Sequence, residues 1–395
     1  MNADPQPTDW RSITIVWLAG AVASLALLKA SPAAVDLRTG LGLSLSQLAW
    51  VSSIFTVMTV ALGVFVGGWG VRFGARNLAS LGLLMLAIAG AATTLAAAPA
   101  ALIIGRLVEG TGFVLVVVCA PALIASLAHP KDGRLVLGVW ATWLPAGGIL
   151  VMFAAPLLLA IGGWRALWWF GALCAVIALA LLTRLPAPPK TSSAASVGLR
   201  LALGQPRPWL LTLAFAFFVM QLYAVLLFAP TYLVEELGYP LAKSTLISSV
   251  VLVMAAVGGL SASALMHRGA SPALIMVISL SLLAGVIPSL LLFADTGLPA
   301  LLLLVLHGLL SGFTASSVYA QAPTTASTPA AIGIIMGLIM AGNGLGILVG
   351  PPIVATVIEA TGSWQLGTLV PVIACVSGVV CVWILSRLKT PPVDP

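Results

Sequence analysis

Two ionisable side chains stand inside an apolar run, residues 99–119, that is long enough to cross a bilayer. Arg106 and Glu109 are three residues apart, so a helix places them on one face, where their charges partly neutralise each other. A charge at the bilayer centre costs about 2.5–3.5 kcal/mol on insertion scales. The pair either fixes helix packing or forms a polar site on a path for a solute or protons, and we expect the second. Glu109 is the one carboxylate within the predicted spans, which makes it the candidate proton carrier.

A third charge, Lys29, falls in the outer half of the first predicted span. Its chain can snorkel to the headgroups, or it can be a cation in the same cavity as Arg106. With both cations set against Glu109, the formal charge is +1. That charge favours a small anion, because the planar fork of arginine binds carboxylates and other oxyanions through two parallel hydrogen bonds.

Four further polar side chains fall inside predicted spans and are candidate substrate-binding residues. Gln221 and Tyr223 can hydrogen-bond a ligand or a neighbouring helix. His307 titrates near neutral pH when exposed, so it can carry protons, or it can be a neutral imidazole bonded to a backbone carbonyl. Asn343 stands among glycines.

The composition requires a lipid environment. Of 395 residues, 61% are hydrophobic and 7% charged, whereas soluble proteins have about 25% charged residues. No nucleotide-binding loop, catalytic triad or zinc motif occurs, so we expect no enzyme, no cofactor and no metal site. The four cysteines fall in apolar runs and indicate packing. The net charge of +7 comes mainly from loops, so it does not indicate nucleic acid.

Hydropathy predicts an all-α membrane protein with twelve spans, at 13–35, 46–70, 77–97, 100–127, 135–160, 164–184, 209–233, 243–266, 272–294, 298–320, 331–358 and 365–387. The polar stretch 186–208 is rich in Pro, Ser and basic residues. It is typical of a cytoplasmic linker between two six-helix halves, 1–185 and 209–395.

The basic residues predict the orientation. Twelve Lys and Arg fall in loops on the side of the N-terminus, and three fall on the other side: Arg38, Arg165 and Lys243. By the positive-inside rule both termini are cytoplasmic. The N-terminus has no basic n-region, so the first span is expected to be its own insertion signal. The expected location is a bacterial inner membrane.

The two halves resemble each other at an offset near 200. Thr111-Gly112-Phe113 recurs as Ser311-Gly312-Phe313, and Gly148 to Val151 recurs as Gly346 to Val349. Six plus six helices with an internal repeat predict a transporter, with its solute site near the midplane between the halves.

On these features the chain resembles the major facilitator superfamily. The family's loop motif after the second span, G-x-x-x-D-R-x-G-x-R, matches Gly67, Arg72, Gly74 and Arg76, with Val71 in the Asp position. The resemblance implies that this loop latches one conformation.

The family's fourth helix often carries R-x-x-Q-G, and here Arg106, Glu109 and Gly110 stand in that pattern. By resemblance Arg106 takes part in proton coupling or substrate binding. The substitution of Glu for Gln adds a titratable partner. Helices one, four, seven and ten line the cavity in this family.

The resemblance also bears on the direction of transport, uptake or export. The antiporter motif of helix five is poorly matched, with Gly138 and Gly147 in place but Val151 where Gly-Pro should begin. Gly163-Trp164-Arg165 is similar to the cyanate and nitroimidazole porter branch.

We therefore expect a monomeric carrier that takes up a small anion with protons by alternating access. The alternatives are a proton-antiport exporter of drugs or metabolites, a non-transporting sensor or assembly factor, and metal uptake through His307, Met336 and Met340.

Overall fold

The computed structural model describes residues 7–129, 132, 136, 139–140, 142–185, 204–325 and 331–388. Most of the predicted linker, including Lys190 and Arg200, and the predicted motif residue Gly138 lie outside these ranges. Within them the chain is helical and holds 11 helices long and apolar enough to cross a membrane. One of these, α8, is interrupted at Gly162 and Gly163 and makes two crossings. The structure therefore agrees with the twelve predicted spans.

The helices follow one another in two series. The first contains α1 (Trp10–Leu28), α2 (Ala34–Leu41), α3 (Leu45–Ser53), α4 (Val57–Phe73), α5 (Ala75–Thr93), α6 (Pro99–Leu127) and α8 (Trp143–Leu182). The second contains α10 (Pro206–Glu235), α11 (Leu241–His267), α12 (Pro272–Leu292), α13 (Leu298–Gln321), α14 (Ala331–Thr361), α15 (Trp364–Gly367) and α16 (Leu369–Arg387).

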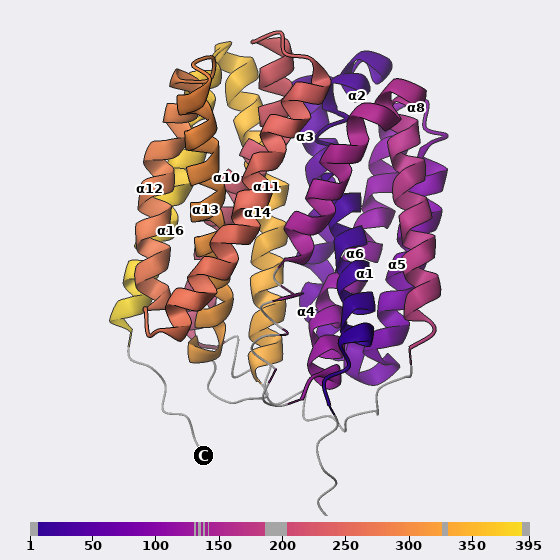
Figure 1. The fold of residues 1–395 in the computed structure, drawn as a ribbon, viewed down its shortest axis with the longest axis vertical. Helices are drawn as coiled ribbons and strands as arrows, with labels where there is room; N and C mark the ends of the chain where they lie inside the picture. The colour runs from indigo at the N-terminus through magenta and orange to yellow at the C-terminus, as the bar shows by residue number, and fades with distance from the viewer. Residues whose placement is uncertain are drawn as a thin grey trace, which may run out of the picture.

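Figure 1 shows the two series side by side, the first in indigo to magenta and the second in red to yellow. We call them the N half and the C half. The end of the bundle that carries α2 is called the α2 end, and the end at which α1 begins and α16 finishes is called the terminus end.

The first predicted span is not one helix. The prediction of a continuous span over 13–35 is wrong, because α1 ends at Leu28 and a turn leads to the separate α2. The second span is also interrupted, by a 3-10 turn at Ile54–Thr56 between α3 and α4. Breaks at membrane depth are tolerated where the freed backbone groups find partners inside the protein.

The bend in α8 has a local cause. Gly163 has φ +61°, a left-handed conformation that favours glycine. The Trp164 backbone N–H donates to Asp36 Oδ2 at 2.5 Å, and the Arg165 guanidinium donates to the carbonyl oxygens of Thr94 and Ala96. These contacts fix the turn between the fifth and sixth crossings against α2 and the end of α5.

The predicted linker reaches too far. α10 begins at Pro206, and the Arg207 guanidinium is buried and donates to the carbonyl oxygen of Leu388 at 2.5 Å. Arg207 is therefore not a linker residue, because it joins the start of α10 to the end of α16.

The two halves are bonded to each other near the α2 end. Arg38 forms an ion pair with Glu235, and the Ser46 backbone N–H donates to Glu359 Oε1 at 2.8 Å. The Ser31 hydroxyl donates to the Leu226 carbonyl at 2.5 Å. A further hydrogen bond joins the halves, from the Thr56 hydroxyl to the Gly344 carbonyl near the middle of α14, at 3.0 Å. The structure is thus a conformation closed at the α2 end.

Candidate coupling cluster and central cavity

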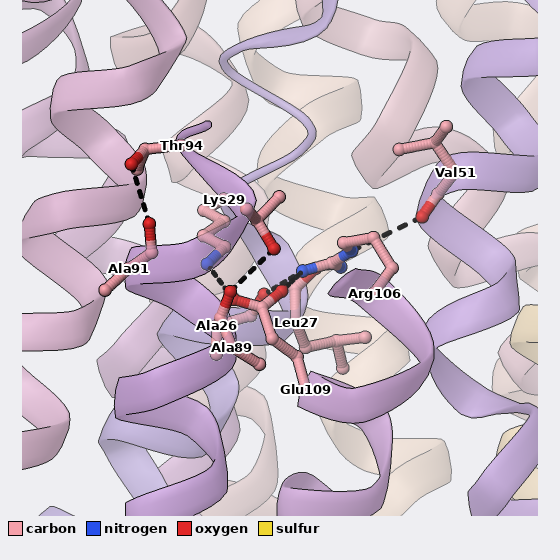
Figure 2. Close-up of polar contacts among 10 residues, drawn as sticks. Ala26, Leu27, Lys29, Val51, Ala89, Ala91, Thr94, Arg106 and Glu109 are labelled. Atoms are coloured by element: carbon pink, nitrogen blue, oxygen red, sulfur yellow. Dashed lines mark hydrogen bonds and ion pairs between the residues drawn. The ribbon is translucent and has the colours of Figure 1, made fainter. Parts of the chain in front are cut away.

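Lys29, Arg106 and Glu109 meet at one point in the N half, as Figure 2 shows. Lys29 Nζ lies 2.5 Å from Glu109 Oε1, and Arg106 Nη1 lies 2.8 Å from Glu109 Oε2. Each carboxylate oxygen therefore faces its own cation. All three side chains are at most 1% exposed. We call these three residues the coupling cluster.

Arg106 also completes the broken end of α1. Its Nη1 donates to the carbonyl oxygen of Ala26 at 2.7 Å, and its Nη2 donates to that of Leu27 at 3.1 Å. The last carbonyls of a helix have no partner within the helix. Its Nε donates to the Val51 carbonyl of α3 at 3.3 Å (Figure 2). One guanidinium thus joins α1, α3 and α6.

Two aromatic rings cover the cations. The Arg106 guanidinium lies 4.3 Å from the ring centroid of Phe55, and Lys29 Nζ lies 4.5 Å from that of Trp168. Cations over aromatic faces are stabilised by the ring quadrupole, by about 2 kcal/mol or more where water is excluded. The rings thus shield the charges and contribute to their stabilisation.

Glycines make room for the cluster. A Cβ atom added at Gly90 of α5 would lie 3.2 Å from Glu109 Oε1, and one at Gly171 of α8 would lie 3.7 Å from Lys29 Nζ. A Cβ at Gly110 would lie 1.7 Å from the carbonyl oxygen of Phe55. Gly110 is therefore the residue that lets α6 approach the break in the second span.

The structure excludes one of the two interpretations of Lys29. Its ammonium group points to Glu109 and Trp168 and does not reach the protein surface. Snorkelling is thus not its role in this conformation.

A second polar group lies in the C half. His307 Nε2 of α13 lies 3.0 Å from Gln221 Oε1 of α10, and both side chains are fully buried. The histidine is therefore bonded to a side-chain amide rather than to a backbone carbonyl. The remaining polar atom of each side chain, His307 Nδ1 and Gln221 Nε2, has no hydrogen-bond partner among the described residues. Unpartnered buried polar atoms are uncommon in folded proteins.

A central cavity of about 80 Å³ lies between the halves. It is lined by the first residues of α8 and by α10, α11, α13 and α14. Tyr223 and Asn343 belong to the lining, whereas Lys29, Arg106, Gln221 and His307 do not. The lining is otherwise aromatic, aliphatic and hydroxylic, and it includes Trp143, Phe215, Phe218, Ser311 and Tyr319. No Lys, Arg, Asp or Glu lines it among the described residues.

The predicted latch residues lie at the terminus end. Gly67 and Arg72 belong to α4, and Gly74, at φ +88°, separates α4 from α5. The Arg72 guanidinium lies over the ring of Phe73, and the Arg76 guanidinium donates to the carbonyl oxygen of Leu185 after α8. These contacts stay within the N half, so the latching role stays a prediction.

Sequence reasoning missed the aromatic partners of the cluster and of the cavity. Phe55 and Trp168 have no motif that marks them, and both stand in apolar runs. A break in the second span, which brings Phe55 over Arg106, had no Gly or Pro signal at residues 54–56. In the described part of the chain, no group of three or more His, Cys, Asp or Glu gathers where it could hold a metal ion.

Comparison with known proteins gives the family. The model of the Major Facilitator Superfamily matches residues 16–338. The chain belongs to this superfamily. It is therefore a multi-pass membrane transporter and not an enzyme, as the sequence predicted.

Curated relatives match part of the chain. A methylenomycin A resistance protein of Bacillus subtilis is 27% identical over 181 residues, which are 44% of this chain and 39% of that protein. A triacylglyceride transporter of Mycolicibacterium smegmatis is 28% identical over 181 residues, 43% of this chain and 32% of that protein. The matched segments thus span less than half of these relatives.

Solved structures match the whole fold. A bacterial homologue of the human lysosomal transporter Spinster, in an inward-facing and occupied conformation, superimposes with a TM-score of 0.79 at 16% identity, covering 98% of each chain. A D-xylose–proton symporter superimposes with a TM-score of 0.77 at 18% identity, covering 96% of this chain and 97% of that one. At sequence identities of 16% and 18%, these superpositions show a shared fold and nothing about the solute.

Proposed function

We propose that this protein is a proton-coupled secondary transporter in which Glu109 carries the proton. The observation that supports this proposal is a fully buried carboxylate held between two cations, one in the segment after α1 and one on α6. Intramembrane ionisable residues mark ion and substrate pathways, and proton relays in transporters use carboxylates. The two halves then alternate around the central cavity.

Protonation of Glu109 changes the contacts between helices. The neutral acid no longer attracts Lys29 of the segment after α1 or Arg106 of its own helix. The end of α1 loses its ionic tie to α6, and the N half can repack against the C half. Loss of the proton restores both ion pairs.

For the solute, we place first a mainly apolar compound without net charge, exported in exchange for protons. The uncharged, aromatic lining of the central cavity supports this choice. Apolar pockets with a few placed polar groups bind such compounds, and Tyr223, Ser311 and Asn343 supply those groups here. The name of one partial relative, a triacylglyceride transporter, also fits an apolar solute.

The second candidate is uptake of a small anion with protons, which the sequence favoured. The formal charge of +1 on the coupling cluster supports it. In this mechanism protonated Glu109 frees Arg106 to bind the anion. Arg106 donates to three backbone carbonyls in the present conformation, so the end of α1 must first move away.

We further propose a monomer in a bacterial inner membrane with both termini cytoplasmic. The distribution of Lys and Arg supports this orientation. With the α2 end outside, the bonded contacts near that end close the outer side of the present conformation.

The experiment is proton movement in proteoliposomes that hold a pH dye in the lumen, without an imposed gradient. Lipophilic compounds, neutral and cationic, and small anions such as cyanate, nitrite, formate and lactate are added outside. An antiported solute that enters drives protons out, so the lumen becomes alkaline. A symported anion acidifies it.

Glu109→Gln is expected to abolish either response, with Glu236→Gln as the matched control, because Glu236 pairs with Trp364 in the C half. A full proton response in Glu109→Gln would overturn the proposal. Acidification by anions alone would establish the second candidate.

A further inference from the structure

A second cavity, of about 310 Å³, lies at the α2 end and entirely within the C half. It is lined by α10 to α14, by α15 and by the start of α16. The central cavity contains none of these lining residues. Its volume is within the range of about 300–1,000 Å³ that small-molecule sites occupy. It is thus large enough to be a site in its own right.

The wall of this cavity is apolar. Aliphatic side chains dominate the lining, and its two aliphatic hydroxyls, Ser248 and Thr368, donate to carbonyl oxygens of their own helical segments. The rings of Tyr232 and Trp364 pack together at a centroid distance of 5.2 Å. Such a wall recognises an apolar chain by shape and by exclusion of water.

The mouth of the cavity carries one charge. Lys243 is the only charged residue in the described lining, and its Nζ lies 3.6 Å from the ring centroid of Tyr239. Glu236 is not in the lining, and its carboxylate accepts a hydrogen bond from Trp364 Nε1 at 2.9 Å. Lys243 forms no ion pair among the described residues, so its charge is available to a ligand.

The cavity also reaches the surface. Lys243 is exposed, and Leu301 of the lining is 41% exposed. α13 is long and apolar enough to cross a membrane, and Leu301 is in its first turn, so an apolar chain can enter at this edge of the bilayer while its head stays near the boundary.

From this geometry we infer that the C half binds a single-chain anionic amphiphile, a long-chain carboxylate, with its chain in the cavity and its head on Lys243. The site is distinct from the central cavity, and it does not depend on the direction or coupling of transport. Since it lies beside Glu235, which pairs with Arg38 across the halves, its occupation would stiffen the α2 end.

The test uses the purified full chain in lipid nanodiscs and a diazirine-bearing palmitate as the probe. After irradiation, peptide mapping should place the label on the cavity lining, and dodecanoate should compete better than dodecanol or dodecylammonium. Lys243→Gln should raise the probe concentration that gives half-maximal labelling by about threefold to fivefold, because an exposed ion pair contributes on this scale. Lys243→Arg should leave it unchanged.

Ala229→Phe fills the cavity and should abolish labelling of its lining. Ala242→Phe, an exposed neighbour outside the lining, is the matched control. A monodisperse elution profile establishes that each variant is folded. Label spread over the lipid-facing surface, labelling insensitive to Ala229→Phe, or preference for dodecylammonium would each overturn the inference.

Discussion

The coupling cluster holds two positive charges and one negative charge. This imbalance determines how much each side chain contributes to the stability of the fold. Two cations face one carboxylate in a fully buried place. Removing one partner of a buried ion pair costs about 3–5 kcal/mol, because it leaves an uncompensated charge. Loss of Glu109 leaves two such charges, whereas loss of Lys29 leaves a neutral pair.

We therefore predict that Glu109→Gln destabilises the protein by about 3–5 kcal/mol and that Lys29→Met, at similar volume, destabilises it less. The measurement is thermal unfolding of the purified protein in detergent, followed by intrinsic tryptophan fluorescence. Equal losses, or a larger loss in Lys29→Met, would show that the charge count does not govern stability here.

Arg106 stabilises the end of α1 through the shape of its guanidinium group as well as through its charge. Arg106→Lys keeps the charge, but an ammonium cannot reproduce the fork that holds the Ala26 and Leu27 carbonyls. Leaving a buried acceptor unpaired costs about 1–3 kcal/mol. We predict that Arg106→Lys lowers the melting temperature and increases hydrogen exchange at the end of α1. Unchanged exchange there would mean that α1 ends at Leu28 for another reason.

At the scale of elements, the approach of α6 to the break in the second span depends on Gly110. A methyl group there would overlap the Phe55 carbonyl, so α6 and the 3-10 turn must move apart and Phe55 must leave Arg106. We predict that Gly110→Ala abolishes the proton response in proteoliposomes and lowers the yield of folded protein.

Gly285→Ala in α12 is the matched control. A Cβ added there meets no atom within 4 Å. In a helix, alanine is favoured over glycine by about 0.8–1.0 kcal/mol. We expect full transport and equal or higher stability. A fully active Gly110→Ala would mean that the distance between α6 and the turn is not critical.

At the scale of the molecule, the contacts near the α2 end hold the two halves in one conformation. Glu359 accepts hydrogen bonds from both the backbone N–H and the hydroxyl of Ser46 across the halves. Glu359→Ala removes these acceptors and should shift the population toward a conformation open at the α2 end.

Spin labels at Thr39 and Thr361, in a cysteine-free background, report this shift. Double electron–electron resonance should show a larger population of long distances between the two labels. Glu236→Gln, whose partner Trp364 lies in the same half, should leave the distribution unchanged. An unaltered distribution in Glu359→Ala would show that apolar packing, rather than these bonds, closes the α2 end.

The sequence alone determined the features that depend on local pattern. Apolar run length predicted the crossings, and the spacing of three residues placed Arg106 and Glu109 on one helical face. The tertiary structure alone decided which segment supplied the second cation and which carbonyls Arg106 bonds, because these partners are 55 to 80 residues away in sequence. Pro32, three residues after the C-cap Lys29, is a local signal for the end of α1, but the partner of the Ala26 and Leu27 carbonyls, Arg106, comes from another helix. The uncharged lining of the central cavity likewise follows from how helices pack, which turns the three charges of the cluster away from the space between the halves.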